Sequence, residues 1–591
     1  MALRRGRSIV AAALLAACAG GGDESGNSSA GCSGGCFLQT PLSLSVVEVQ
    51  RIVSQAAHEA QARGAPATIA VVDRVGNVLA VFRMSGAPGT VTVSSGRGVS
   101  GGLENASGIP AELAAISKAK TGAYLSTEGN AFTTRTASQI VQEHFNPREA
   151  NAPSGPLFGV QFSSLACSDV VLAASGVGAG PKGSPLGLAA DPGGLPLYKA
   201  GIVVGGVGVL ADGLYGLDLD ILDVDQSADE LIAVAGSRGF EAPANRRADR
   251  LTIDGRSMRY VDSEALAADP AAAPPFASLP GALVDVPGFF SPPVVSAGAA
   301  YGTTASGYRA DSSGAFVLDD GAGNARFPPI GGTDGLLTQA EVRTVLAEAM
   351  RVANRTRAQI RLPLGSTAQV TVAVVDTSGA VLGLVRTPDA PVFGTDVAVQ
   401  KARTALLFSH PATPADMAAL PAAAPYASAL VGGIAYSTRA VGNLARPFLP
   451  DGMEGSGPGP LSKPFASWSP FSTGLQLDLV QSQLTAPAPG DCTALPRARN
   501  GIQIFPGGVP IFRGSTLVGA IGVSGDGVQQ DDLIAFRGLA NAGAALGTGI
   551  GNAPPSVRAD TLVATGGHLR YVVCPVAPFV DSTASNACDG L

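Results

Sequence analysis

The sequence has few charged residues, few aromatic residues and few histidines. Of its 591 residues 14% are charged and 5% are aromatic, with four histidines and one tryptophan. The formal net charge of −7 and the lack of a Lys/Arg-rich run with interleaved aromatic residues argue against nucleic-acid binding. No internal apolar run is long enough to span a bilayer. Glycine (77) and proline (43) are abundant, which is typical of long irregular loops.

Two parts of the chain carry the same sequence blocks in the same order. Ala-Val-Val-Asp at 70–73 returns at 373–376. The other matched blocks are 118–121 with 401–404, 196–209 with 510–523, and 247–261 with 558–572. Four blocks in the same order, offset by 283 to 314 residues, indicate a tandem duplication of one domain, not a solenoid, whose units are far shorter. Each functional prediction can therefore be tested on two copies.

The N-terminus resembles a bacterial lipoprotein signal. Three arginines within residues 4–7 precede an apolar stretch, as in a secretory signal. The stretch ends in Leu-Ala-Ala-Cys at 15–18, which resembles a lipobox, so residues 1–18 are predicted as the signal peptide and Cys18 as the lipid-modified residue. Gly/Ser-rich residues 19–40 are predicted as a flexible tether. An ordinary signal peptide with an incidental cysteine is the alternative.

Six cysteines remain after Cys18. An even number in an exported chain indicates disulfides, although six cysteines allow 15 pairings. Cys32 and Cys36 are candidates for a local pair, and Cys588 for a bond that pins the C-terminus. A metal site at Cys32 and Cys36 is the alternative, but no histidine or second cysteine pair lies nearby.

Each copy is predicted as an α+β domain with an antiparallel sheet flanked by helices. Apolar residues at helical spacing predict a first helix over 44–63, which returns over 338–359. Strand patterns follow, and then a second helix and a final helix. The domain boundaries are predicted at 41–262 and 337–591, the latter including a C-terminal tail, with a Pro/Ala/Gly-rich linker over 263–336. The predicted local elements are strands 68–73, 78–83, 369–376 and 380–386, second helices 118–126 and 397–409, and final helices from Asp229 and Asp531.

These blocks together resemble the GlcG/HbpS haem-binding family, also called the haem-degrading domain family. The similar elements are Ala-Val-Val-Asp-x-x-Gly, a strand ending in arginine, Lys-Ala-x-Thr on a helix, and a Pro-Leu/Ile-aromatic to Gly-rich hairpin. The resemblance covers about 42–145 and 195–240, and again 337–446 and 500–540. It implies two profilin-like α+β domains that pair as an internal pseudo-dimer or form a homo-oligomer. It also implies binding of haem or a related tetrapyrrole, and in some members haem breakdown.

Seven residues are candidates for ligand binding. The cations on the Lys-Ala-x-Thr helix and in the following turn would pair with a propionate or another anion. The alternative for each lysine is an ion pair with Asp73 or Asp376 that stabilises the fold. These aspartates precede a turn glycine and are predicted to close the turn. The candidates are Lys118, Thr121, Arg135, Lys401, Thr404, His410 and Arg439.

Histidine ligands are scarce, because the sequence has four histidines. His410 follows the second Lys-Ala-x-Thr helix and is the best axial candidate among His58, His144, His410 and His568. No Cys-x-x-Cys-His occurs, which excludes c-type haem attachment. The acidic insert with Asp218, Asp220, Asp223 and Asp225 would hold calcium or form a strand with one wet face. No catalytic residue is assigned.

The leading functional hypothesis is a lipid-anchored extracytoplasmic protein that binds a small ligand, with haem as the cofactor. Such a protein would lie in the bacterial cell envelope, at the outer membrane or facing the periplasm. One alternative is a structural or interaction lipoprotein that keeps the fold without a working pocket. The other is a haem-degrading enzyme, which ranks last because the sequence shows no evident nucleophile, acid–base pair or metal cluster.

Overall fold

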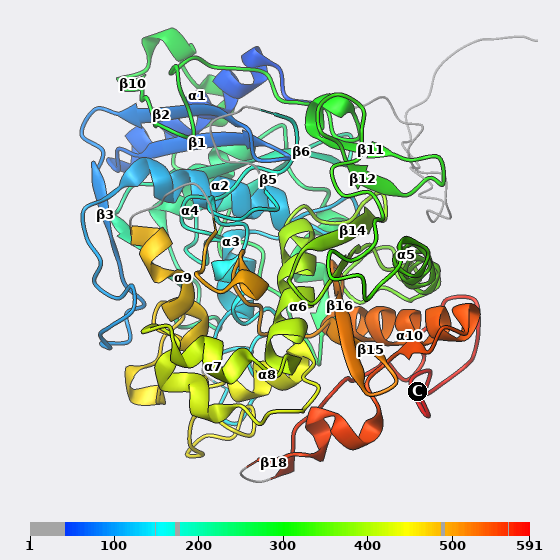
Figure 1. The fold of residues 1–591 in the computed structure, drawn as a ribbon. Helices are drawn as coiled ribbons and strands as arrows, with labels where there is room; N and C mark the ends of the chain where they lie inside the picture. The colour runs from blue at the N-terminus through cyan, green and yellow to red at the C-terminus, as the bar shows by residue number, and fades with distance from the viewer. Residues whose placement is uncertain (1–41, 148, 172–177, 486–490, 565–566) are drawn as a thin grey trace, which may run out of the picture. The chain divides into compact units, whose positions relative to one another are not determined.

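The computed structural model describes residues 42–147, 149–171, 178–485, 491–564 and 567–591 (Figure 1). The predicted signal peptide with Cys18, the tether and the pair Cys32 and Cys36 lie outside the described residues. All described residues belong to one unit, so the contacts between the copies are contacts within it. None of the helices in the described ranges has both the length and the apolar character needed to cross a membrane.

Both copies are built on the same four antiparallel strands. The first sheet has the order β10-β2-β1-β6-β5 and the second β11-β12-β14-β13-β16-β15-β17, so β2-β1-β6-β5 corresponds to β14-β13-β16-β15. This α+β architecture with antiparallel sheets confirms the predicted fold class. The shared strands are β1 (Thr68–Asp73), β2 (Val78–Met84), β5 (Gly194–Lys199), β6 (Ile202–Leu210), β13 (Thr371–Val375), β14 (Val381–Arg386), β15 (Gly508–Arg513) and β16 (Thr516–Ser524).

Register and irregularities also repeat. Ala70 faces Gly208 in the first sheet, and Ala373 faces Gly522 in the second. In both copies the first strand shifts register against its hairpin partner after the same valine, and the β5–β6 and β15–β16 hairpins shift at matching positions. A β-carbon on Gly208 or Gly522 would collide with a carbonyl oxygen of the helix above, so these glycines permit close helix–sheet packing. Bulges are conserved within protein families. Their recurrence at equivalent positions therefore indicates that the two copies share one backbone.

Helices cover both faces of each sheet. In the first copy α1 (Val46–Arg63) and α4 (Ala228–Ser237) pack on one face and α2 (Ala111–Leu125) on the other. In the second copy α5 (Gln339–Ala353) and α10 (Val528–Leu546) lie on one side of the sheet, with α6 (Gly394–Ser409) on the other (Figure 1). Alternate strand residues point to the two faces, so Ile69 and Val71 meet α1 whereas Ala70 and Val72 meet α2. α1 and α5 both begin at a capping box.

The two copies share one hydrophobic core through α2 and α6. A single buried cluster contains Ala119 and Ala123 of α2 together with Ala402 and Ala405 of α6. Residues of the two copies therefore lie in one core. The pairing as an internal pseudo-dimer stays a prediction.

The segment 263–336, predicted as a linker, adds strands to both sheets. β10 (Gly281–Leu283) pairs with β2, whereas β12 (Phe316–Leu318) pairs with β14 and with β11 (Tyr308–Ala310). The prediction missed these strands because each is only three residues long. The remaining elements are β3 (Thr90–Val93), β4 (Ile109–Pro110), α3 (Thr134–Ile140), β7 (Leu214–Tyr215), β8 (Thr252–Ile253), β9 (Arg256–Ser257), α7 (Thr413–Ala418), α8 (Thr438–Leu444), α9 (Leu475–Thr485), β17 (Ile550–Gly551), β18 (Val563–Ala564) and β19 (Gly567–His568).

Candidate functional site

Lys118 and Lys401 occupy equivalent places, and each is fully buried against a carboxylate of the final helix. Lys118 Nζ lies 2.7 Å from Asp229 and 2.6 Å from Asp191. Lys401 Nζ lies 2.7 Å from Asp531. The alternative that paired these lysines with the turn aspartates is therefore wrong, because the carboxylates they meet come from α4 and α10.

Asp73 and Asp376 instead close the turns that follow the first strands. Asp73 Oδ1 accepts the backbone N–H groups of Val75 and Asn77, at 3.1 and 2.9 Å. Asp376 Oδ1 accepts the N–H groups of Ser378 and Ala380, each at 3.0 Å. The predicted turn role is confirmed in both copies.

The number of carboxylates decides how firmly each lysine holds its proton. Burial lowers the pKa of Lys118, but Asp191 and Asp229 outweigh it and raise the pKa above its ordinary value. Burial dominates for Lys401, whose pKa is lowered despite Asp531. Burial also raises the pKa of Asp229 and of Asp531 to about 7. An ion pair with one carboxylate leaves more of the desolvation penalty uncompensated than an ion pair with two.

The threonines of the Lys-Ala-x-Thr motif bind the loops that lead into β5 in the first copy and β15 in the second. The Thr121 hydroxyl donates to the Ser117 carbonyl and accepts the Ala189 N–H at 2.7 Å. In the second copy Thr404 accepts the N–H of Gln503 at 2.8 Å. The motif thus positions equivalent loops in both copies.

Arg135 and Arg439 differ in how completely they are neutralised. Arg135, with no exposed side-chain surface, contacts four carboxylates: Asp218, Asp225, Glu230 and Asp262, at 2.7, 2.8, 3.0 and 2.8 Å. Arg439, whose side chain is 13% exposed, pairs with Asp532 at 2.5 Å.

The acidic insert of the first copy supplies two of the four carboxylates at Arg135, those of Asp218 and Asp225. Residues 218–225 form no strand, with a turn at 221–222 and otherwise bends and irregular backbone, so the alternative of a strand with one wet face is wrong. Carboxylate oxygens of Asp218, Asp223 and Asp225 lie within 4.8 Å of one another, and the Arg135 guanidinium supplies a positive charge to two of them. The calcium site stays a prediction.

The histidines lie apart from these clusters. His410 caps the end of α6, where its Nδ1 accepts the Ala412 N–H at 3.2 Å, and burial and Arg497 lower its pKa. His144 is buried, stacks on the Phe448 ring and lies 3.1 Å from Glu454. His410 as an axial ligand remains a prediction.

None of the seven candidate residues lines either of two cavities in the described residues. The larger, of about 480 Å³, lies in the first copy beside the β8–β9 hairpin. The smaller, of about 220 Å³, lies in the second copy beside the C-terminal tail. Because Lys118 and Lys401 are fully buried, a ligand could reach neither without movement of the protein.

Lys120 is a buried residue that the sequence prediction missed. It occupies the position of Arg403, which forms a bidentate pair with Asp169 at 2.7 Å, but Lys120 Nζ donates to the Gly183 carbonyl and forms no ion pair in the described part of the chain. Burial and the nearby Lys182 lower its pKa to about 7. The signal was present in the sequence, because this position is a cation in both copies.

Lys120→Met is expected to reduce the pH dependence of stability. Unfolding raises the Lys120 pKa from about 7 to its ordinary value of 10.5, so the unfolded chain binds the additional proton between these pH values. The free energy of unfolding therefore rises with pH in that window, by about 1.4 kcal/mol per unit from this group. Urea unfolding at pH 7 and 9 measures the slope. Equal slopes for wild type and variant would contradict this assignment.

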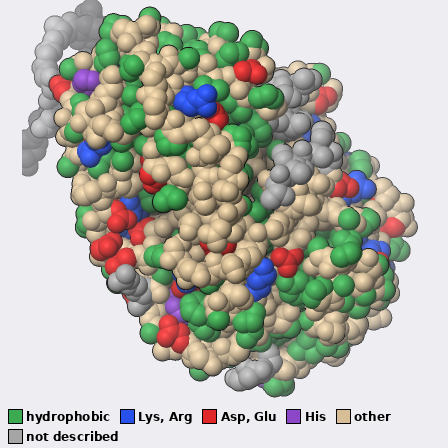
Figure 2. All heavy atoms as spheres, turned by 90° about the vertical axis from the view of Figure 1, so that its left-hand side faces the viewer, with side chains coloured by type: hydrophobic (Ala, Val, Ile, Leu, Met, Phe, Trp, Pro, Cys, Tyr) green, Lys and Arg blue, Asp and Glu red, His purple; other side chains and the backbone are tan. Residues whose placement is uncertain are grey.

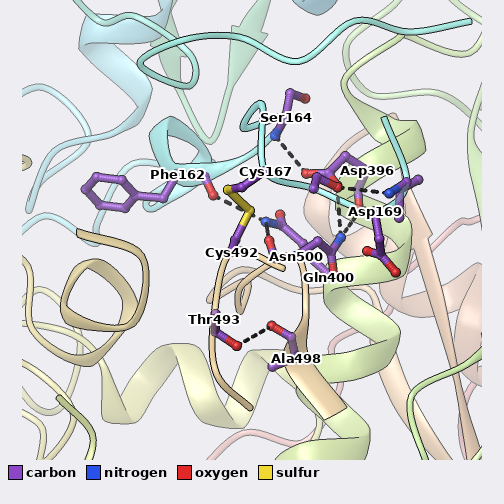
Figure 3. The surroundings of a disulfide bond; sticks show 12 residues. Phe162, Ser164, Cys167, Asp169, Asp396, Gln400, Cys492, Thr493, Ala498 and Asn500 are labelled. Atoms are coloured by element: carbon purple, nitrogen blue, oxygen red, sulfur yellow. Dashed lines mark hydrogen bonds between the residues drawn. A yellow bond between two sulfur atoms is a disulfide. The ribbon is translucent and has the colours of Figure 1, made fainter. Parts of the chain in front are cut away.

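A polar network and a disulfide join the loop between α3 and β5 of the first copy to the second copy. Cys167 and Cys492 form a disulfide, and both side chains are buried. Beside it Asp396 accepts hydrogen bonds from the Ser164 N–H at 2.7 Å and from the Asn500 side chain at 2.9 Å (Figure 3). The loop between α3 and β5 is thus covalently attached to the second copy.

Two segments of the second copy and one of the first match a known family. The model described as haem degrading protein HbpS-like matches residues 44–97, 345–443 and 470–540. These segments contain α1, β1 and β2 of the first copy, and the β13–β14 hairpin, α6 and the β15–β16 hairpin of the second. They are HbpS-like, which confirms the resemblance found in the sequence. No curated protein matches the chain.

Several solved structures are similar to about a third of the chain. Protein ORFY of Klebsiella pneumoniae, of the DUF336 family, is 21% identical over 36% of this chain and 92% of its own, with a TM-score of 0.20. A double mutant of HbpS from Streptomyces reticuli is 20% identical over 35% and 92%, with a TM-score of 0.17. PduOC, solved as a complex with heme, is 17% identical over 36% and 94%, with a TM-score of 0.19.

Proposed function

We propose that this protein is a lipid-anchored, extracytoplasmic haem-binding protein with two HbpS-like domains. The observation that carries the proposal is the match of both copies to the haem-degrading, HbpS-like family model. The duplicated strand order and the shared bulges support one common architecture in the two copies.

The cysteines support an oxidising compartment. Cys167 pairs with Cys492, and Cys574 pairs with Cys588, which attaches the C-terminal tail as expected for Cys588. Disulfides persist in secreted and envelope proteins and are rare in the cytosol. Together with the lipobox pattern ending at Cys18 they favour a location in the cell envelope.

The larger cavity does not by itself fit a tetrapyrrole. Its residues Ile221, Met258 and Tyr260 are at most 5% exposed, and the carboxylates Glu149 and Asp249 line it together with two arginines. The haem part of the proposal therefore rests on the family match in both copies.

Haem titration of the purified protein is expected to give a saturable shift of the Soret band in both oxidation states. Bound haem that stays intact with a reductant would indicate a carrier, whereas its decay would indicate a degrading enzyme. Absence of a shift in either oxidation state would contradict haem binding.

One observation favours a second function. The candidate cations are engaged in ion pairs inside the protein, as expected for a structural or interaction protein that kept the fold without the pocket. The surface does not favour either of these two functions, because charged side chains occur only in small groups on the face shown in Figure 2.

A further inference from the structure

Arg386 at the end of β14 is a buried cation without a carboxylate partner. Its surface is fully covered, and it forms no ion pair in the part of the chain that the structure describes. The guanidinium donates to the Thr395 hydroxyl at 2.5 Å and to the carbonyls of Ala390 and Pro391. The Tyr308 ring lies over it, 4.4 Å from ring centre to guanidinium carbon. All of these partners are neutral, and a buried charge is costly unless an opposite charge compensates it.

The first copy has a carboxylate at the equivalent place. Arg83 is the equivalent of Arg386 in β2, and it pairs with Glu112 in the first turn of α2 at 2.8 Å. Glu112 and Thr395 each lie six residues before the lysine of the Lys-Ala-x-Thr motif, so Thr395 occupies the position of Glu112. The Arg83 side chain is 41% exposed. The second copy therefore has the more deeply buried arginine and lacks the acid.

Two buried hydroxyls lie beside Arg386 on the neighbouring strands. Thr371 of β13 stands opposite Arg386 of β14 and opposite Ser524 of β16. Side chains of directly opposed residues share one face of the sheet, with β-carbons about 4.5–5.5 Å apart. Thr371 Oγ1, Ser524 Oγ and Arg386 Nε are buried and have no hydrogen-bond partner among the described residues, although each can donate. In the first copy only the threonine recurs without a partner, as Thr68, and Leu210 stands at the place of the serine.

The N-terminus of α6 lies against these side chains. A β-carbon on Gly394, the first residue of α6, would lie 3.4 Å from Thr371 Oγ1 and 2.7 Å from the Ser524 carbonyl oxygen. No side chain caps this end of the 16-residue helix, and the helix dipole favours an anion there. The N–H groups of Gly394 and Thr395 bond to carbonyls of the preceding turn, so side chains would hold the anion.

The carboxylates on the adjoining segments are held by other groups. Asp389 pairs with two other arginines. Asp396 accepts hydrogen bonds from the loop between α3 and β5. Asp526 accepts two backbone N–H groups, at 2.7 and 2.8 Å. The charge on the Arg386 guanidinium is therefore left for an anion from solution.

We propose that Arg386, Thr371 and Ser524 bind a small monovalent anion of the size of chloride. The anion neutralises the guanidinium and accepts hydrogen bonds from Arg386 Nε and from both hydroxyls. It takes the place that the Glu112 carboxylate has in the first copy. Only a small anion fits, because all three residues are fully buried. The site lies in the second copy alone and does not depend on haem binding.

Thermal unfolding of the full chain at constant ionic strength tests the site, with chloride replaced by gluconate, an anion too large for it. A ligand that binds only the folded chain makes the melting temperature depend on its concentration. The melting temperature is expected to rise by about 2 °C between about 1 and about 100 mM chloride. Thr371→Val and Ser524→Ala each remove a donor, and each is expected to shift this response to about tenfold higher chloride.

Two further variants separate a bound anion from a general effect of salt. Thr395→Glu supplies the carboxylate that the first copy has at this position, and is expected to make the melting temperature independent of chloride. Arg83→Met is the matched control, because Glu112 already compensates this arginine, and it is expected to keep the wild-type response. A wild-type melting temperature that does not change with chloride would overturn the site. An undiminished response in both Thr371→Val and Thr395→Glu would overturn it as well, and neither result bears on the haem titration.

Discussion

Replacing Asp531 with alanine is expected to lower the free energy of unfolding by about 3–5 kcal/mol. The change leaves Lys401 fully buried without the carboxylate that lies 2.7 Å from its Nζ. Removing one partner of a buried pair leaves an uncompensated charge, which costs far more than the pair itself contributes. Denaturation in urea at pH 7 measures the loss.

Two variants control this prediction. Asp229→Ala makes the matched change in the first copy, where Lys118 keeps Asp191 at 2.6 Å, so its loss is expected to be clearly smaller. Lys401→Met combined with Asp531→Leu removes both charges and is expected to recover most of the stability. Equal losses for Asp531→Ala and Asp229→Ala would contradict the role assigned to the second carboxylate.

Replacing both Cys167 and Cys492 with alanine is expected to lower the free energy of unfolding by about 3–5 kcal/mol. The bond joins residues 325 positions apart and connects the two copies, so its loss frees the unfolded chain over most of its length. The loss would also release the loop between α3 and β5, which contributes Ser164 and Asp169 to the polar network on α6.

The second disulfide provides the control. Cys574 and Cys588 are 14 residues apart, and the entropy of closing a loop grows with its length, so replacing this pair is expected to cost less. Denaturation of both double variants under the same oxidising conditions makes the comparison. A larger loss for the tail disulfide would contradict the view that the first one holds the copies together.

The sequence predicted the parts of the fold that depend on local periodicity. The first helix of each copy was found because apolar residues recur at helical spacing behind a Ser or Thr cap. The strand hairpins were found because alternating residues surround a turn glycine. The sequence predicted that α2 begins at Lys118, but the helix begins at Ala111. The earlier start was missed because the first turns are alanine-rich and the N-cap residue Pro110 makes no side-chain capping bond.

Long-range features could not be predicted in the same way. Lys118 meets Asp229 and Lys401 meets Asp531 across more than a hundred residues, and no local pattern selects those carboxylates over the turn aspartates. The cavity combines α3, the loop after β7 and a hairpin near residue 256, which come together only in the folded chain. The duplication identified the block at 247–261 that contains this hairpin, but it did not show that the hairpin lines a cavity.

The stoichiometry of haem binding tests the account most directly. Titration of the full chain, followed at the Soret band, is expected to saturate at no more than one haem for each copy, because HbpS-like segments lie in both copies. The absence of saturable binding, or saturation above two haems per chain, would contradict this account.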